Sequence, residues 1–157
     1  MKGEGMWREV IQITNTEGVS AVFSNKLLRT KELLNPLHSK GLYVNIDEVE
    51  PGGYSAKYHW HTLQDEFFLI LEGHGIARIG DRSHPIRSGD FFFKPANSLA
   101  HQFFNNGEEI LKILDCGIAH TEDAIVYPDD QVVWLQSLNL AFKLSHSVQN
   151  WSSTPDA

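Results

Sequence analysis

The feature that most limits the fold of this chain is a series of short alternating segments separated by closely spaced turns. In Leu42, Val44 and Ile46, for example, apolar residues recur at every second position. Side chains alternate between the two faces of a strand, so this pattern predicts half-buried β-strands. Turn signals recur about every 8–12 residues from Gly41 onward, a spacing typical of a sandwich or closed barrel. We therefore predict an all-β fold, with turns at Pro51-Gly52-Gly53, Gly73-His74-Gly75 and Gly80-Asp81.

The flanking segments are less regular. The stretch from Val19 to Phe23 alternates as a strand would, and Ser24 is expected to cap a short helix that carries four leucines and ends at Pro36. Beyond Tyr127 we expect an extension that ends in a loose tail. The 157 residues suit one domain. We divide it into an N-terminal arm (1–40), a barrel core (about 41–117) and a C-terminal extension (118–157).

Charge and composition exclude several classes of function. The formal net charge of -7 would repel a phosphate backbone, so no nucleic-acid partner is expected. No run of about 18 apolar residues is present, so we expect no membrane span. The first residues lead into no apolar stretch of the secretory kind. The single cysteine, Cys116, cannot form an internal disulfide, which favours a cytoplasmic location.

Four residues have the side chains and spacing of a metal site. His59 and His61 are two apart on a predicted strand, so both imidazoles face the same side. Glu66 begins the next strand and supplies a carboxylate oxygen. His101 is distant in sequence, but a barrel can bring its strand alongside the first. Three imidazoles and a carboxylate, without a thiolate, suit iron, manganese, nickel, copper or zinc. From the residues alone, ordinary surface or core histidines explain the pattern equally well.

The spacing of these residues resembles the cupin superfamily. Gly53, His59, His61, Glu66 and Gly73 match the first cupin motif throughout. The second motif is matched in most positions by Gly89, Pro95, His101 and Asn105. Its usual glycine is replaced by Asn97, with one additional residue before His101. Asparagine is the non-glycine residue that best tolerates a positive φ, so we expect the turn to be kept.

A narrower likeness is to an uncharacterised cupin subgroup. The features that carry it are His59-Trp60-His61, Asp65-Glu66-Phe67 and Tyr127-Pro128-Asp129. The superfamily resemblance implies an antiparallel jelly-roll barrel, or double-stranded β-helix, with one divalent transition metal ion held by His59, His61, Glu66 and His101.

Other residues are expected around this site. Asn105 is predicted to hold a backbone turn or to orient His101 through a hydrogen bond. The predicted substrate pocket is lined by Lys57, Phe68, Ile70, Phe103 and Tyr127. The apolar members of this set have plain core packing as their alternative role. Lys57 could instead be exposed at the surface. Tyr127 could either fold over the barrel mouth or have a plain packing role.

Three functions are compatible with this site. The first is a metal-dependent dioxygenase-type oxidoreductase acting on a small organic molecule, in which Glu66 moves a proton. The second is a non-redox isomerase, decarboxylase or lyase that stabilises an enolate. The third is a small-molecule binding or sensing protein without catalysis. A homodimer is expected, with Val19 to Phe23 as the candidate sheet edge that pairs with a second copy.

Overall fold

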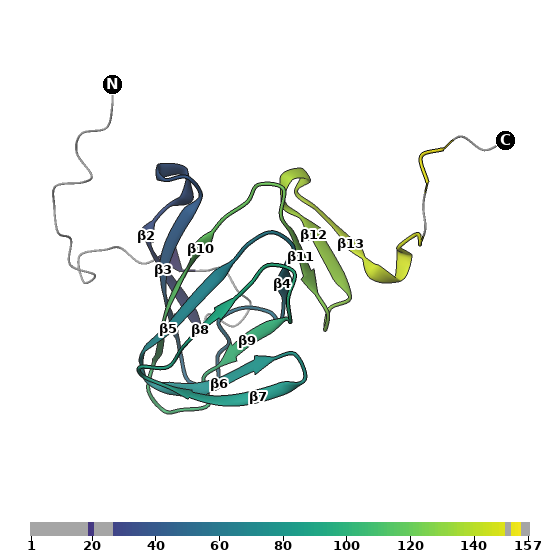
Figure 1. The fold of residues 1–157 in the computed structure, drawn as a ribbon. Helices are drawn as coiled ribbons and strands as arrows, with labels where there is room; N and C mark the ends of the chain where they lie inside the picture. The colour runs from purple at the N-terminus through teal and green to yellow at the C-terminus, as the bar shows by residue number, and fades with distance from the viewer. Residues whose placement is uncertain (1–18, 21–26, 150–151, 155–157) are drawn as a thin grey trace, which may run out of the picture.

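Three antiparallel sheets make up the part of the chain that can be described. The computed structural model describes residues 19–20, 27–149 and 152–154. Figure 1 shows the sheets wrapped around a common interior, with β6 and β7 at the opposite end of the molecule from β12 and β13. The expected all-β architecture is confirmed, because no helix of these residues exceeds three residues.

The largest sheet has six strands within the described residues and forms one wall of the barrel. Strand β10 lies at its centre and pairs with β3 on one side and β5 on the other. In spatial order its strands are β1 (Val19–Ser20), β2 (Leu28–Leu34), β3 (Leu42–Val49), β10 (Leu111–Ile118), β5 (Glu66–Glu72) and β8 (Phe91–Lys94).

Two smaller sheets complete the described structure. The three-stranded sheet consists of β7 (Arg82–Arg87), β6 (His74–Ile79) and β9 (His101–Phe104). The four-stranded sheet contains the C-terminal strands and the short strand that carries His61. Its order is β13 (Leu140–Lys143), β12 (Val132–Leu135), β11 (Ala124–Tyr127) and β4 (Trp60–His61). The C-terminal residues thus pair directly with the predicted site.

The predicted N-terminal helix is wrong in its described part. Residues 28–34 form β2, which pairs with β3 in antiparallel register from Leu28 opposite Val49 to Leu34 opposite Val44. Pairing with a neighbouring strand here overrides the helical spacing of the leucines. Asn35 caps a single 3-10 turn (Pro36–His38). Ser24 and most of the predicted 19–23 strand lie outside the described residues. Two further 3-10 turns are Gln136–Leu138 and Leu144–His146.

The inward faces of five strands change from apolar to polar along their length. In β10, Leu111 and Ile113 are fully buried, whereas Asp115, next on the same face, lines a cavity. In β3, Val49 is buried in the core and Asp47 faces the cavity. The same change occurs in β2, β5 and β9. One end of the barrel is therefore a packed core and the other is a polar chamber. The core residues are Leu28, Val49, Phe68, Ile70, Ala77, Ile86, Phe103, Leu111 and Ile113.

The turn before β9 keeps the conformation expected from its sequence. Asn97 has a φ of 53°, the left-handed conformation that asparagine tolerates, as predicted. Its amide donates to the carbonyl of His61 over 2.7 Å, and Asp65 accepts from the amide of Ala96 over 2.8 Å. The lengthened turn is therefore anchored on both sides of the His61–Glu66 segment. Gly73 has a φ of 81°, and a side chain there would approach the carbonyl of Ile110 to 2.7 Å.

None of the helices in the described ranges has the length and apolar character needed to cross a membrane.

Candidate metal centre

Backbone pairing brings His59 and His101 together. The two residues form an antiparallel bridge, with His101 donating to the carbonyl of His59 over 2.8 Å and His59 donating back over 3.1 Å. Directly opposed residues project on the same face of a sheet. Their imidazole centroids are accordingly 4.7 Å apart. One pair of hydrogen bonds thus joins two histidines that are 41 intervening residues apart in sequence.

His61 and Glu66 complete the arrangement. The Nε2 atom of His61 lies 3.3 Å from Oε1 of Glu66, and Nδ1 of His101 lies 3.9 Å from Oε2. Among the described residues, His59, His61 and Glu66 form a group whose potential ligand atoms all lie within 4.8 Å of one another, so the group could hold a metal ion. His101 borders this group through both His59 and Glu66.

Hydrogen bonds fix which nitrogen of each first-motif histidine faces the site. His59 Nδ1 lies 2.6 Å from the carbonyl of Lys57, which can only accept, so this nitrogen carries the proton. His61 Nδ1 lies 2.6 Å from Oδ2 of Asp123. Nε2 is then the nitrogen that each ring presents to the site, and that of His61 lies beside Oε1 of Glu66. Asp123 is fully buried and is held in turn by Thr62 and Leu63. A histidine backed by a carboxylate is the usual support of a metal ligand.

Burial keeps two of the imidazoles neutral. It lowers the pKa of His59 to about 4 and that of His101 to about 3. Both rings are therefore unprotonated near pH 7, the state in which imidazole binds metal ions. His101 is 3 % exposed, and its Nδ1 atom has no hydrogen-bond partner.

Glu66 and His61 shift each other's pKa in opposite directions. Burial would lower the pKa of His61, but its hydrogen bonds to Glu66 and Asp123 raise it overall. Burial would likewise raise the pKa of Glu66, but the hydrogen bond from His61 and the charge interactions with the three histidines together outweigh it, and the pKa falls to about 2. Glu66 is therefore an anion that is 4 % exposed, and its Oε2 atom has no hydrogen-bond partner.

A buried lysine approaches the same carboxylate from β8. Lys94 lies opposite Glu66 in the sheet, and its Nζ atom is 3.7 Å from Oε2 of Glu66. Burial lowers the pKa of this lysine, while the charge of Glu66 opposes the shift. Its Nζ atom has no hydrogen-bond partner, so Lys94 contributes charge near Glu66 rather than a directed bond.

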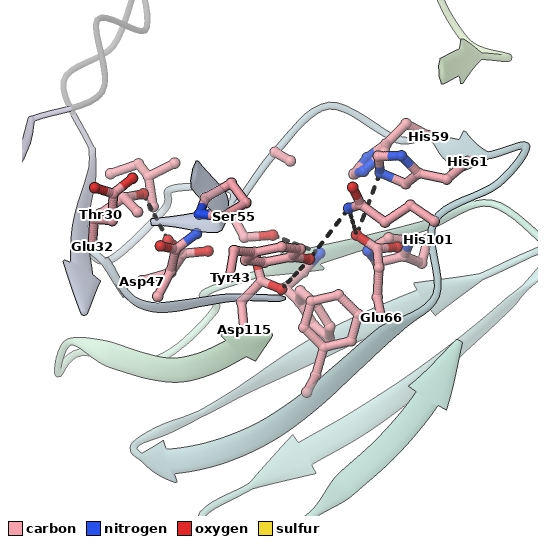
Figure 2. A pocket seen from close by; sticks show the side chains of 17 residues that line it. Thr30, Glu32, Tyr43, Asp47, Ser55, His59, His61, Glu66, His101 and Asp115 are labelled. Carbon is pink, nitrogen blue, oxygen red and sulfur yellow. Dashed lines mark hydrogen bonds and ion pairs between the residues drawn. The ribbon is translucent and has the colours of Figure 1, made fainter. Parts of the chain in front are cut away.

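These residues form one end of a cavity of about 450 Å³. Figure 2 shows His59, His61, Glu66 and His101 together on one side, which we call the histidine end. Tyr43 and Asp115 lie in the middle. Thr30, Glu32 and Asp47 lie on the opposite side. Together with Asn45, which lies opposite Glu32 in the sheet and also lines the cavity, they form what we call the acidic end.

Carboxyl groups away from the histidines have raised pKa values. Burial raises the pKa of Asp47 to about 6, against a hydrogen bond from Thr30 at 2.6 Å. Burial and the charge of Asp47 raise the pKa of Asp115 well above its usual value. Tyr43 donates to Asp115 over 3.0 Å, and burial raises the pKa of its phenol far above the usual range. The carboxyl groups of this region therefore bind protons more tightly than Glu66 does.

The structure places only some of the residues predicted to line the pocket on the cavity wall. Phe68 and Phe103 line the cavity. Ile70 lies in the core, where it is 1 % exposed. Lys57 is exposed and pairs with Asp130 at 2.8 Å. The ring of Tyr127 lies 5.8 Å from that of His59, outside the cavity lining.

The hydrogen bonds of Asn105 are those expected for holding a backbone turn, the first of its two predicted roles. It is fully buried and donates to the carbonyls of Val49 and Glu109, each over 2.8 Å. Its Oδ1 atom accepts from the amide of Gly107 over 2.9 Å. These three bonds fix the chain between β9 and β10, next to the strand that carries His101.

Sequence reasoning missed Asp123 and the acidic end. Asp123 lies 62 residues beyond His61, in a segment interpreted as an extension, and no spacing rule connects the two. Asp47 stands at an alternate position of a strand whose other face is apolar, as on any half-exposed strand. Its inward orientation became visible only when β2 and β10 were placed on either side of β3.

Comparison with known proteins identifies related chains. Residues 45–117 match a family profile described as a cupin domain. An uncharacterized protein of the archaeon Methanocaldococcus jannaschii is 32% identical over 87 residues, which cover 55% of this chain and 69% of the relative. The matched residues include His59, His61, Glu66 and His101.

Two solved structures match nearly the whole chain. One is a candidate sugar phosphate isomerase from Acidithiobacillus ferrooxidans, with a TM-score of 0.77 and 23% identity over 89% of this chain and 93% of that one. The other is a sugar phosphate isomerase of a cupin superfamily from Silicibacter pomeroyi. It has a TM-score of 0.77 and 22% identity over 88% of this chain and 95% of that one. At this identity the likeness establishes the fold.

Proposed function

The chain belongs to the cupin superfamily, and from that premise we propose that it is a metal-dependent enzyme of the non-redox kind, an isomerase or lyase acting on a small carbonyl compound. The proposed ligands are His59, His61, Glu66 and His101. The metal would be one divalent ion of the iron, manganese, nickel, copper or zinc group.

One observation carries the metal site. Glu66 Oε2 and His101 Nδ1 are buried atoms without a hydrogen-bond partner, and they lie 3.9 Å apart beside the His59–His61 pair. A buried polar atom left unpaired costs about 1–3 kcal/mol, so such atoms usually serve a ligand. A cation bound by these donors would satisfy both atoms at once. The mixed nitrogen and oxygen donors suit a first-row transition metal.

The non-redox reaction is supported by the fold comparison and by the cavity. Both structures that match nearly the whole chain are described as isomerases of sugar phosphates. Most of the residues that line the cavity have polar side chains, which suit an oxygen-rich substrate better than an apolar one. A bound divalent metal would supply Lewis acidity that stabilises negative charge on a carbonyl oxygen.

The protein would supply the proton transfer. Asp115 faces the middle of the cavity, and burial raises the pKa of its carboxyl group, the direction that makes a carboxylate a stronger general base. Tyr43, held against Asp115 at 3.0 Å, stays protonated and can donate a hydrogen bond. In this proposal Glu66 serves as an anionic ligand, because a group with a pKa of about 2 is a weak base. The phenyl rings of Phe68 and Phe103 limit access of water.

The test is metal analysis combined with a proton-exchange assay. Protein purified without an affinity tag is analysed for metals, reloaded with manganese, zinc or iron, and incubated in D₂O without oxygen with a panel of aldoses, ketoses and small keto acids. We expect one equivalent of metal and metal-dependent deuterium incorporation beside the carbonyl group, detected by NMR.

One double variant and one control variant make the result specific. The double substitution His59→Ala/His61→Ala should abolish both metal binding and exchange. His84→Ala, which removes an exposed histidine of β7, should change neither. Oxygen uptake matched to substrate loss would replace this proposal with the dioxygenase reaction. Ligand binding without metal or turnover would favour a sensing protein.

A further inference from the structure

The acidic end consists of polar side chains on the same inward face of the barrel as the apolar core. Asn45 and Asp47 occupy alternate positions of β3, on the same face as the core residue Val49. Thr30 and Glu32 of β2 lie opposite Asp47 and Asn45 in the sheet. The four side chains therefore form one continuous polar wall across two neighbouring strands, and all four line the cavity.

This wall is not neutralised by the protein. Among the described residues that line the cavity, four are carboxylic acids and none is lysine or arginine. The nearby lysine of β2, Lys31, pairs instead with Glu48 over 2.8 Å. Asp47, which is 9 % exposed, accepts one hydrogen bond from Thr30 through Oδ1. Burying a carboxylate without a cation is unfavourable, and fold stability gives no reason to keep it.

A second observation indicates that the wall faces a ligand. The same cavity contains Glu66 Oε2 and His101 Nδ1, which are buried and have no hydrogen-bond partner. The cavity of about 450 Å³ joins these atoms to Asp47, with Tyr43 and Asp115 between them. A molecule that reached the histidine end while filling this volume would contact the acidic end with its other half. Figure 2 shows the two ends on opposite sides of Tyr43.

The chemistry of the wall selects the kind of group that it can hold. Carboxylate oxygens accept hydrogen bonds, the amide of Asn45 both donates and accepts, and the hydroxyl of Thr30 can do either. Hydroxyl groups fit such a mixture because each one donates and accepts. A phosphate ester would bring negative charge against Asp47 and Glu32, where no described cation compensates it.

We infer that the acidic end binds the hydroxyl groups of a neutral polyhydroxylated substrate, such as an unphosphorylated sugar, and discriminates against its phosphate ester. This inference rests on the proposed function for the reacting end of the molecule. It adds the substrate class and assigns substrate recognition to Thr30, Glu32, Asn45 and Asp47.

The experiment compares matched pairs of sugars. Isothermal titration calorimetry and ligand-observed NMR measure the binding of D-ribose against D-ribose 5-phosphate and of D-fructose against D-fructose 6-phosphate. Each pair is measured with metal-loaded protein and with metal-free protein. We expect the neutral member of at least one pair to bind about tenfold more tightly than its phosphate ester.

Two substitutions at neighbouring positions of β3 test the wall. Asp47→Asn should weaken the discrimination against phosphate by about tenfold, because it removes a buried negative charge. Glu48→Gln removes a carboxylate from the other face of the same strand and should leave the discrimination unchanged. Because Asn keeps the oxygen that accepts from Thr30, the first variant is expected to fold.

The outcomes separate this inference from the proposed function. Tighter binding of the phosphate esters, or no binding of neutral sugars at high millimolar concentration, overturns the inference even if the metal site is real. Preference for D-glucosamine over D-glucose by tenfold or more overturns it too, since the wall would then select cationic charge. Discrimination by protein that binds no metal and shows no deuterium exchange after metal reloading supports the inference and contradicts the proposed function.

Discussion

The carboxyl groups at the two ends of the cavity have pKa values shifted in opposite directions. At the histidine end, the pKa of Glu66 is lowered to about 2 and that of Asp123 is also lowered, because hydrogen bonds and the charge interactions with histidines together outweigh burial. At the acidic end, burial raises the pKa of Asp47 to about 6, although Thr30 donates to it. Both ends belong to the same barrel interior, and Tyr43 and Asp115 lie between them.

The difference shows which end is prepared for a cation. Glu66 is already ionised beside neutral His59 and His101, so binding a metal there requires little change in charge on these groups. Asp47 has no comparable support, and the protein accepts its burial at a cost in stability. A buried charge that destabilises the fold and makes no compensating contact indicates selection for function. The acidic end therefore carries the stronger signature of substrate recognition, and the histidine end that of cofactor binding.

The largest effect is expected from neutralising the acidic end. The pKa of Asp47 rises from 3.8 to about 6 on folding, so the folded protein binds the proton more tightly. Stability contributed by this group is therefore highest near pH 4, decreases as the pH rises to about 6, and stays low above it. Asp47→Asn removes this pH dependence. The difference in free energy of unfolding between the variant and the wild type should therefore favour the variant more at pH 7–8 than at pH 4, by up to about 3 kcal/mol.

Urea denaturation between pH 4 and pH 8 measures this difference. Glu48→Gln is the matched control, because its carboxylate pairs with Lys31 outside the cavity and its loss should cost about 1 kcal/mol or less. If Asp47→Asn destabilised the protein at pH 8, the carboxylate would have an unrecognised stabilising partner. The contrast between the two ends would then be lost.

A smaller effect is expected from the support of the histidine end. Asp123 accepts from His61 through Oδ2 and from Thr62 and Leu63 through Oδ1. An asparagine has one oxygen, so Asp123→Asn must lose one of these interactions. Metal affinity should fall by about 10–100-fold, as for other residues that orient metal ligands. Competition titration with a chromogenic chelator measures the change.

Asp65→Asn provides the comparison for Asp123→Asn. Asp65 lies next to Glu66 and accepts from the amide of Ala96, a bond that the asparagine oxygen can keep. Its substitution removes the same formal charge and should change metal affinity by less than about threefold. Equal losses in the two variants would mean that general charge, and not orientation of His61, determines metal affinity.

The sequence predicted the histidine end well because its information is local. Strand alternation placed His59 and His61 on one face, and the family spacing added Glu66 and His101. The structure brings all four together, while their role as ligands stays a prediction. Asn97 was also predicted correctly, because a left-handed turn depends on one residue and its neighbours.

The acidic end and Asp123 could not be predicted because they depend on pairing between distant strands. Asp47 faces a cavity only because β2 and β10 flank β3. The leucines of β2 were assigned to a helix for the same reason, since their true partners lie in β3. Asp123 reaches His61 only because β11 pairs with β4, where Ile125 lies opposite His61. Local spacing cannot supply such contacts.

The smallest effect is expected from the residue between the two ends. Gln64 donates to Tyr43 over 3.3 Å and to Glu66 over 3.5 Å, both weak hydrogen bonds. Gln64→Leu should therefore cost about 1 kcal/mol or less. In a double-mutant cycle, the stability change caused by Asp47→Asn should be the same in both backgrounds within about 0.5 kcal/mol. A coupling above about 1 kcal/mol would mean that Gln64 joins the ends into one electrostatic unit, so that metal binding would change sugar affinity through the protein itself.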